Sequence, residues 1–515
     1  MIDVPALLDG LQIVLSWQVL LFIILGLVVG VILGAVPGVS GALGIALTLP
    51  LTYTMQPLDA IMFLSGMFTG SVYAGGITAV MLNIPGSPGA VATTLDGYPM
   101  TKQGRQNEAS GLVSCHLLGV WVILSFSFSF SQWVTLSYFF KHLKCCLLSL
   151  LFQLLALKGT YPKHSLLGFL VYFGLSEQRL TGRERGTFGQ IELYEGIQIV
   201  PALMGLLAIS ELFYLVQQKF IVGDKTTHIQ RSLKDFVKGC MLVIKQKVNT
   251  IRSIIIGIFI GVLPAAGATV ASLVSYSQAQ TFSKNKDNFG KGEDSGLIAA
   301  ETANSSSEGG GMATMLTFGI PGGSATAVLM AAFMIHGLTP GPYLIRDHMD
   351  LTYAVIIGNI IQAFFLLFIG FIFVWYFSKL VLAPARLIIP IVAIFSLLGA
   401  FSVRGIYLDV VLTLGFAVLA LVMRKLDYPL IAVLLGLILG ATIDGEMTRT
   451  LLIYEGQYLS LFERPIFTTM FVITMLLFIL PLVQKIWARK KRKVNRRRTL
   501  NDSATFRTSR RYTNP

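Results

Sequence analysis

The sequence has few charged residues for its length and few of the side chains that hold metals or crosslinks. Charged residues make up 13% of the 515 positions, whereas soluble domains carry about 25%. The four cysteines, at 115, 145, 146 and 240, lack metal-ligand spacing, and we predict no disulfide framework. The motifs His-Glu-x-x-His and Gly-x-x-x-x-Gly-Lys-Ser/Thr are both absent. These absences argue against an ordinary soluble domain, a zinc peptidase of that type and a P-loop nucleotidase.

Apolar residues are abundant, at 54% of the chain, and the mean hydropathy is +0.71. Several runs approach or exceed the roughly 20 apolar residues that span a bilayer. The clearest of these runs are 17–36, 197–217, 253–283, 351–377 and 466–484. The pattern predicts an all-α polytopic membrane protein with about 10–12 transmembrane or re-entrant segments.

Positive charge gathers in two places, which accounts for much of the net charge of +14. One is the stretch 218–252, which we expect to be a basic loop, and the other is the tail 485–515, which we expect to be disordered. The positive-inside rule places both on the cytoplasmic side. Aromatic residues do not alternate with the basic residues of the tail, so we expect no nucleic-acid partner.

A polar, glycine-rich stretch from Glu301 to Thr326 stands between strongly apolar segments. It contains two acids, an amide, a serine run, three consecutive glycines and a Gly-Ile-Pro-Gly-Gly turn. Irregular polar backbone at membrane depth is tolerated only where protein buries it or where it lines a wet cavity. We therefore expect a broken helix here, with helix N-termini and free carbonyls available to bind ions.

A second copy of this pattern lies upstream. Pro85 and Pro321 each follow a Gly-Gly pair and belong to an Ile-Pro-Gly turn, and they are 236 residues apart. Each copy is preceded by a Gly-x-x-Pro break, with Pro37 and Pro264 separated by 227 residues. Paired broken segments in two halves are a pointer to a transporter binding site. We predict two structural repeats, inverted in topology, with Pro85 and Pro321 facing each other near mid-membrane.

This pattern divides the chain into a first transmembrane repeat (1–217), the basic loop (218–252), a second repeat with C-terminal helices (253–484) and the tail (485–515). The stretch 114–174 is anomalous within the first repeat. Residues 115–173 contain only three of the 50 glycines but three of the four cysteines. Two interpretations stay open, a divergent pair of helices or a compensated frameshift that replaced the original residues.

The motifs match a known family. The chain resembles the large membrane subunit of the tripartite tricarboxylate transporters. The resemblance covers 17–113 and about 179–484, and its first-half motifs are Gly34-x-x-Pro37-Gly38, Gly75-Gly76, Ile84-Pro85-Gly86-Ser87-Pro88-Gly89 and Asp96-Gly97-Tyr98-Pro99. Those of the second half are Gly261-x-x-Pro264, Glu301-x-x-Asn304, Gly309-Gly310, Gly319-Ile320-Pro321-Gly322 and Thr339-Pro340-Gly341-Pro342. The segment 115–173 departs from the family's Gly- and Ala-rich pattern.

The resemblance implies a secondary active transporter subunit of the bacterial inner membrane that takes up tricarboxylates or related organic acids. It implies two protein partners, a small membrane subunit and a periplasmic solute-binding protein. It also implies uptake driven by a cation gradient, with Na⁺ or H⁺ as the coupling ion and no other cofactor. A frameshifted relic that no longer transports is the main alternative.

Candidate binding residues for substrate or ion are the helix-breaking residues, the small polar residues near them, and the acid and amide of the second copy. Backbone N–H groups after Gly86 and Gly322 suit an anion, and Asn304 suits either substrate or cation. We expect Glu301 to be functional, since ionisable residues inside membranes usually are. The full set is Pro37, Gly38, Ser71, Gly75, Gly76, Thr78, Asn83, Pro85, Gly86, Ser87, Glu301, Asn304, Ser305, Gly310, Gly319, Pro321, Gly322 and Ser324. The competing interpretation is that the glycines only allow close helix packing.

An intramembrane serine hydrolase is a weaker alternative, because Gly38-Val39-Ser40-Gly41 matches a short Gly-x-Ser-Gly nucleophile pattern. Such an enzyme would need a histidine beside the serine. His336 and His348 lie near a Pro/Gly turn that we expect at the membrane interface. We therefore expect no catalytic residues and no metal site.

Overall fold

The computed structural model describes residues 4–35, 39–83, 85–115, 191–193, 197–210, 212–213, 232–263, 267–377, 385–402 and 404–426, with isolated residues beyond. Within these ranges the chain is helical and contains no strand. The first half holds α1 (Val4–Val14), α2 (Trp17–Gly34), α3 (Gly41–Thr48), η1 (Leu49–Thr52), α4 (Pro57–Leu82), η2 (Pro88–Ala90), α5 (Val91–Lys102) and α6 (Gln106–Cys115). After it come η4 (Ile191–Leu193), α10 (Ile199–Leu203), η5 (Met204–Ile209), α12 (Leu233–Lys245), α13 (Lys247–Val262), α14 (Gly267–Phe282) and η6 (Lys286–Asn288). The remainder are α15 (Asp294–Phe318), α16 (Ser324–Ile335), α17 (Pro342–Asp347), α18 (Met349–Ile372), η7 (Phe373–Phe377), α19 (Ala385–Ser402) and α20 (Tyr407–Lys425).

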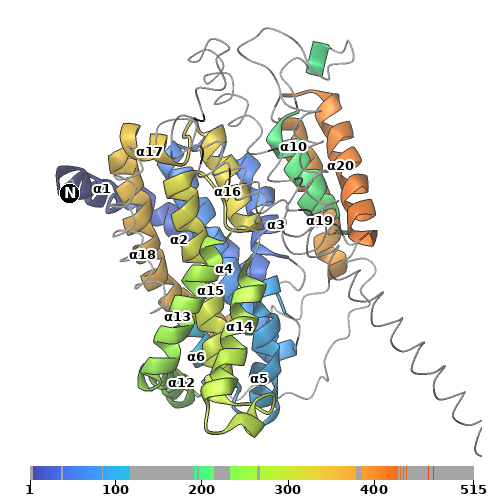
Figure 1. Cartoon of the computed structure of the whole chain (residues 1–515). Coiled ribbons are helices and arrows are strands. Elements are labelled where there is room, and N and C mark those ends of the chain that lie inside the picture. Colours follow the sequence, from blue (N-terminus) through green and yellow to red (C-terminus); the bar gives the residue numbers. More distant parts are fainter. Residues whose placement is uncertain are drawn as a thin grey trace, which may run out of the picture.

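Two closely packed helix pairs form the centre of the bundle, α2 with α4 and α13 with α15 (Figure 1). Small residues let the backbones of each pair approach. Gly30 of α2 lies against the backbone of Met67, and Gly257 of α13 lies against the backbone of Ala303. Helices in lipid gain little from burying apolar side chains against each other, so close van der Waals contact of this kind holds them together.

Four helices of the described residues are long and apolar enough to cross a membrane: α2, α4, α18 with its continuation η7, and α20. Three of them carry exposed apolar side chains along one face, such as Leu21, Leu25 and Ile32 on α2. Such an apolar face is stable against the acyl chains of a bilayer but would be unfavourable in water. The helix count of 10–12 stays a prediction, because 116–190 and most of 427–515 lie outside the described residues.

The expectation of a broken helix from Glu301 to Thr326 is wrong for most of that stretch. Residues 301–318 continue α15 without interruption, and the helix stops only at Gly319. Buried backbone must satisfy its hydrogen bonds internally, so a serine- and glycine-rich segment enclosed by other helices becomes helical. The same holds for Gly75 and Gly76, which lie within α4.

The apolar run 253–283 is divided, since α13 ends at Val262 and α14 begins at Gly267. The stretch 218–252 is likewise not one loop, because it contains α12 and the start of α13. Helix α12 packs on α6 at one end of the bundle. Its Cys240 is disulfide-bonded, contrary to the expectation of no disulfide.

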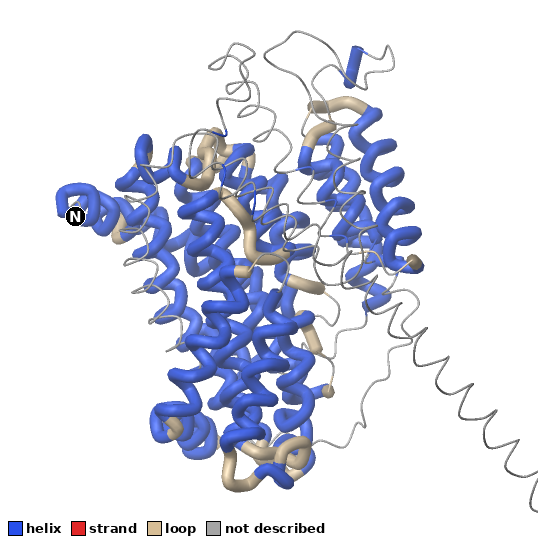
Figure 2. Tube along the Cα trace, in the orientation of Figure 1, coloured by secondary structure: helices blue, strands red, loops and turns tan. Residues whose placement is uncertain are grey.

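The helices α10, α19 and α20 form a second group beside the central bundle (Figure 1). Figure 2 shows loop segments within the depth of the molecule as well as at its ends. The anomalous segment 114–174 lies outside the described residues from 116 onward, and so does the tail 485–515. The predictions about both stay predictions.

Candidate binding cavity

A cavity of about 700 Å³ lies where the two Ile-Pro-Gly turns meet the starts of three helices. Its walls come from α3, α4, the turn before α5, the end of α13, α14, α15, α16, η5, and the end of α20 with the residues that follow it. The polar and charged residues that line it are Ser40, Ser87, Thr269, Asn304, Ser307, Glu308, Ser324, Thr326, Arg424 and Tyr428. The size is typical of a small-molecule site, which usually measures roughly 300–1,000 Å³.

The first turn follows α4. This helix ends at Asn83, whose φ of 59° is left-handed. The Gly86 N–H then donates to the Gly75 carbonyl at 3.3 Å, which folds the turn back against α4. A Cβ atom on Gly86 would lie 2.5 Å from the Gly75 Cα, so glycine is required there. The turn thereby brings Ser87 and Pro88 to the cavity wall.

The second turn repeats this geometry after α15. The helix ends at Gly319, which is also left-handed with a φ of 68°. Gly322 packs against the Gly311 Cα and the Gly261 carbonyl, where a Cβ atom would overlap both. The Gly323 N–H donates to Thr326 Oγ1 at 2.9 Å and caps the start of α16.

Three helices of eight or more residues, α3, α14 and α16, begin at the cavity. Their first residues, Gly41, Gly267 and Ser324, all line it. The first turn of a helix has unpaired N–H groups and a partial positive charge. Three such ends around one space suit a negatively charged group.

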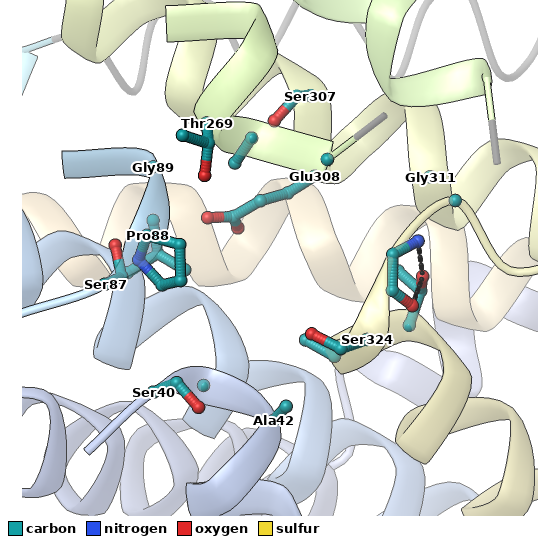
Figure 3. A pocket seen from close by; sticks show the side chains of 18 of the residues that line it. Ser40, Ala42, Ser87, Pro88, Gly89, Thr269, Ser307, Glu308, Gly311 and Ser324 are labelled. Carbon is teal, nitrogen blue, oxygen red and sulfur yellow. Dashed lines mark hydrogen bonds between the residues drawn. The ribbon is translucent and has the colours of Figure 1, made fainter. Parts of the chain in front are cut away.

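Two charged side chains also line the cavity. Glu308 projects from α15, and its carboxylate points into the space between Ser87 and Ser324 (Figure 3). Arg424 comes from the last turn of α20. A guanidinium is well suited to a carboxylate because it presents paired donors in a plane.

Glu301 lies behind the cavity rather than on its wall. It is 1% exposed, and its Oε1 atom accepts a hydrogen bond from the Thr93 hydroxyl. Its Oε2 atom has no hydrogen-bond partner. Asn304, one turn further along α15, does reach the cavity.

The structure brings six of the predicted binding residues to the cavity wall: Pro85, Gly86, Ser87, Asn304, Gly322 and Ser324. Ten others lie outside the wall: Ser71, Gly75, Gly76, Thr78, Asn83, Glu301, Ser305, Gly310, Gly319 and Pro321. Several of these ten have packing roles, such as Gly310 against the Ile258 carbonyl. Pro37 and Gly38 lie outside the described residues.

Sequence reasoning missed Ser40, Thr269 and Arg424. Ser40 follows the first Gly-x-x-Pro break and caps α3 by accepting from the Leu43 N–H at 3.3 Å. Thr269 follows the second break, two places beyond the position that corresponds to Ser40, so the repeat itself was the available signal. No local sequence pattern distinguishes Arg424 from its neighbour Lys425.

Ser40 has no histidine beside it among the described residues that line the cavity. The geometry of a serine nucleophile with its general base is therefore not seen in this part of the chain.

The helical fold, the exposed apolar helix faces and the cavity between the helices define a polytopic α-helical membrane protein with a candidate small-molecule site. The tripartite tricarboxylate transporter TctA family matches residues 20–435. The chain belongs to this family, which is a transporter family.

Two relatives come from Agrobacterium vitis. The chain is 27% identical over 461 residues to an uncharacterized 52.8 kDa protein in the TAR-I ttuC' 3' region, covering 87% of this chain and 89% of that protein. It is 29% identical over 234 residues to an uncharacterized protein in the TAR-II ttuC' 3' region, covering 45% of this chain and 97% of that protein. No solved structure matches the chain.

Proposed function

We propose that the chain is the substrate-translocating membrane subunit of a secondary active transporter that takes up a tricarboxylate or a related organic acid. The observation that carries this proposal is the cavity, where three helix N-termini and Arg424 converge between the two Ile-Pro-Gly turns. The proposed partners are a small membrane subunit and a periplasmic solute-binding protein that delivers the acid. Uptake is driven by a gradient of Na⁺ or H⁺ across the inner membrane.

Matched contacts in the two halves support a repeat architecture. In the first half Gly86 packs on Gly75 near the Gly34 carbonyl, and in the second half Gly322 packs on Gly311 near the Gly261 carbonyl. The left-handed ends of α4 and α15, at Asn83 and Gly319, are also 236 residues apart. In our proposal these halves are inverted repeats, and the substrate binds between their broken segments.

A transporter of two inverted repeats that works by alternating access needs one substrate-binding site formed by both repeats. The two turns line the same cavity, the first through Pro85 and Gly86 and the second through Gly322. That Pro85 and Pro321 face each other stays a prediction. Movement of one half against the other would open this cavity to either side of the membrane in turn.

Substrate protection tests the proposed site. Ser324 is exposed on the cavity wall, and Ser277 is exposed on α14 away from the cavity. Each is replaced by cysteine in a background whose four native cysteines are alanine, and the rate of maleimide labelling is measured. We expect citrate to slow labelling of Ser324→Cys severalfold and to leave Ser277→Cys unchanged. Equal labelling rates of Ser324→Cys with and without citrate and related di- and tricarboxylates would contradict the assignment.

A frameshifted relic is the second candidate, and the composition of 115–173 is the observation that favours it. Translating the alternate reading frame of this stretch tests it. A relic predicts that the alternate frame encodes Gly-rich helices and that restoring it recovers carboxylate uptake. Uptake by the chain as written would rule the relic out.

A further inference from the structure

Glu301 is a buried acid with no basic partner among the residues that the structure describes. The side chain is 1% exposed, and the Thr93 hydroxyl donates a hydrogen bond to its Oε1 atom. Its Oε2 atom is buried and has no hydrogen-bond partner. An ionised carboxylate costs many kcal/mol to bury without a counter-charge, so such a group holds a proton or a bound cation.

A second side chain next to Glu301 also lacks partners. Asn304 is 0% exposed, and neither its Oδ1 nor its Nδ2 atom makes a hydrogen bond. Buried polar atoms are almost always paired in native proteins, so an unpaired amide beside an unpaired carboxylate oxygen indicates a ligand. The Ser87 hydroxyl, in the turn that packs on Asn304 through Gly89, is also buried and unpaired.

The backbone around these oxygens leaves space only for a small ligand. A Cβ atom on Gly76 would lie 2.7 Å from the Glu301 Oε2 atom, and a Cβ atom on Gly89 would overlap the Asn304 Oδ1 atom. Helix α4 and the turn before α5 therefore close the site by direct backbone contact. These contacts leave no room for an organic molecule, so a proton or a single ion is the candidate ligand.

The titratable neighbours of Glu301 provide no positive charge. Helix α4 presents Tyr73, whose hydroxyl is bonded to Ser114, and α15 itself presents Glu308 two turns away. Helix α5 presents Thr93, which does not titrate. The described residues also contain no group of three or more acidic, histidine or cysteine side chains of the kind that holds a divalent metal.

We propose that Glu301, together with Thr93 and Asn304, binds one monovalent cation, a proton or a sodium ion, directly behind the binding cavity. This inference rests on the proposed transport function and assigns a place to its driving ion. Asn304 belongs to both sites, since it neighbours Glu301 and lines the cavity. The cation and the organic acid are therefore linked through one side chain, and each favours binding of the other.

The test needs no organic acid. The purified full-length chain is melted in increasing NaCl against choline chloride at fixed pH, and over a pH series in choline chloride. If sodium is the ligand, the Tm of the wild type rises by several degrees once NaCl is about 100-fold above its Kd. If a proton is the ligand, sodium has no specific effect and the Tm falls as pH rises, because the folded protein loses a bound proton.

Glu301→Gln keeps the shape of the side chain and removes the charge. We therefore expect it to abolish the dependence of Tm on sodium or on pH, whichever of the two the wild type shows. Glu293→Gln is the matched control, since Glu293 lies at the start of the same helix outside the site, and we expect it to retain the response. Thr93→Val, which is uncharged and of equal size, provides a second variant should Glu301→Gln fold poorly. We expect Thr93→Val to reduce the rise of Tm with sodium or, if a proton is the ligand, to shift the pH at which Tm falls.

The proposal is overturned if the wild type responds to neither ion, or if Glu301→Gln responds as the wild type does. Failure of the transport proposal would look different. In that case the ion response would depend on Glu301, but citrate would neither protect Ser324→Cys nor enter cells.

Discussion

At the scale of single residues, two adjacent glycines in the second turn differ in whether there is space for a side chain. Gly322 packs against the Gly261 carbonyl and the Gly311 Cα, whereas a Cβ atom on Gly323 would meet nothing within 4 Å. Both residues line the cavity and differ by one place in the chain. The sequence alone does not show which of the two glycines tolerates a larger residue.

Alanine substitution separates the two glycines. We expect Gly322→Ala to destabilise the fold by about 1–3 kcal/mol, because the added methyl group forces backbone apart in a packed site. We expect Gly323→Ala to change the stability by less than about 0.5 kcal/mol. Thermal melting of the two variants in the same detergent measures the difference. Equal Tm values would show that the close approach of α13 to this turn is not present in solution.

The candidate site was partly predictable at this scale. The Ile-Pro-Gly turns were found because proline and glycine break helices through backbone chemistry that is visible in sequence. Arg424 was not found, because its role depends on where α20 ends relative to a cavity more than 100 residues away in the chain. Glu301 was the acid selected from the sequence, yet Glu308 is the acid that faces the cavity.

At the scale of secondary-structure elements, α12 shows how a basic segment meets a membrane. Its exposed residues include Leu233, Val237, Met241 and Ile244, each at least 45% exposed. Its inner face packs on α6, where Lys238 is 3.1 Å from Glu108. A helix with an uncovered apolar face and lysines beside it is typical of one that lies in the membrane interface.

This arrangement predicts two environments on one helix. Asp235 and Ile244 are both exposed and lie on opposite faces of the helix, since nine residues turn an α-helix by about 180°. We expect a bimane fluorophore on Ile244→Cys to emit at shorter wavelength and to be quenched by spin-labelled lipid, because this side chain belongs to the apolar face. The same fluorophore on Asp235→Cys should respond only to water-soluble quenchers. Identical quenching at the two positions would place α12 away from the bilayer.

Sequence patterns identified the strongly apolar elements and misjudged the polar ones. The run 17–36 is α2, and 351–377 is α18 with η7, because lipid-facing helices must be apolar throughout. The polar stretch of α15 was expected to be irregular, since its serines and glycines are weak helix formers. The helices around it impose internal hydrogen bonding, a tertiary effect that local propensity does not contain.

At the scale of the whole molecule, the described charges differ between the two ends of the bundle. The end with α12 and the loop before α15 carries lysines 234, 238, 245, 247, 284, 286 and 291. The opposite end, with α1 and α17, contains Asp9, Asp347 and Asp350. From this difference the positive-inside rule predicts that the α12 end faces the cytoplasm.

Sidedness of labelling tests this orientation. Lys286 and Asp347 are both exposed and lie at opposite ends of the bundle. In the cysteine-free background, we expect a membrane-impermeant maleimide to label Asp347→Cys in spheroplasts. We expect it to label Lys286→Cys only after the membrane is permeabilised. Labelling of both from the outside would contradict the orientation.

The architecture of the whole molecule was predicted to the level of an all-α membrane protein. The matched glycine contacts lie at the spacing of the sequence repeat, and the two-repeat arrangement itself stays a proposal. The sequence did not indicate that the second group, α10, α19 and α20, would carry Arg424 to the cavity. The position of Arg424 depends on packing between helices that are distant in the chain, and hydrophobic periodicity does not predict such packing.

The central claim is that the cavity binds a carboxylate during transport, and uptake of radiolabelled citrate and related acids tests it most directly. Arg424→Ala is compared with Lys425→Ala, its exposed neighbour that does not line the cavity, in cells that also express the partner subunits. We predict that Arg424→Ala lowers uptake at low substrate concentration by about tenfold or more, since a charge-assisted hydrogen bond contributes about 1.5–3 kcal/mol. Lys425→Ala should stay within about twofold of the parent chain. Equal uptake by both variants and the parent would contradict the account.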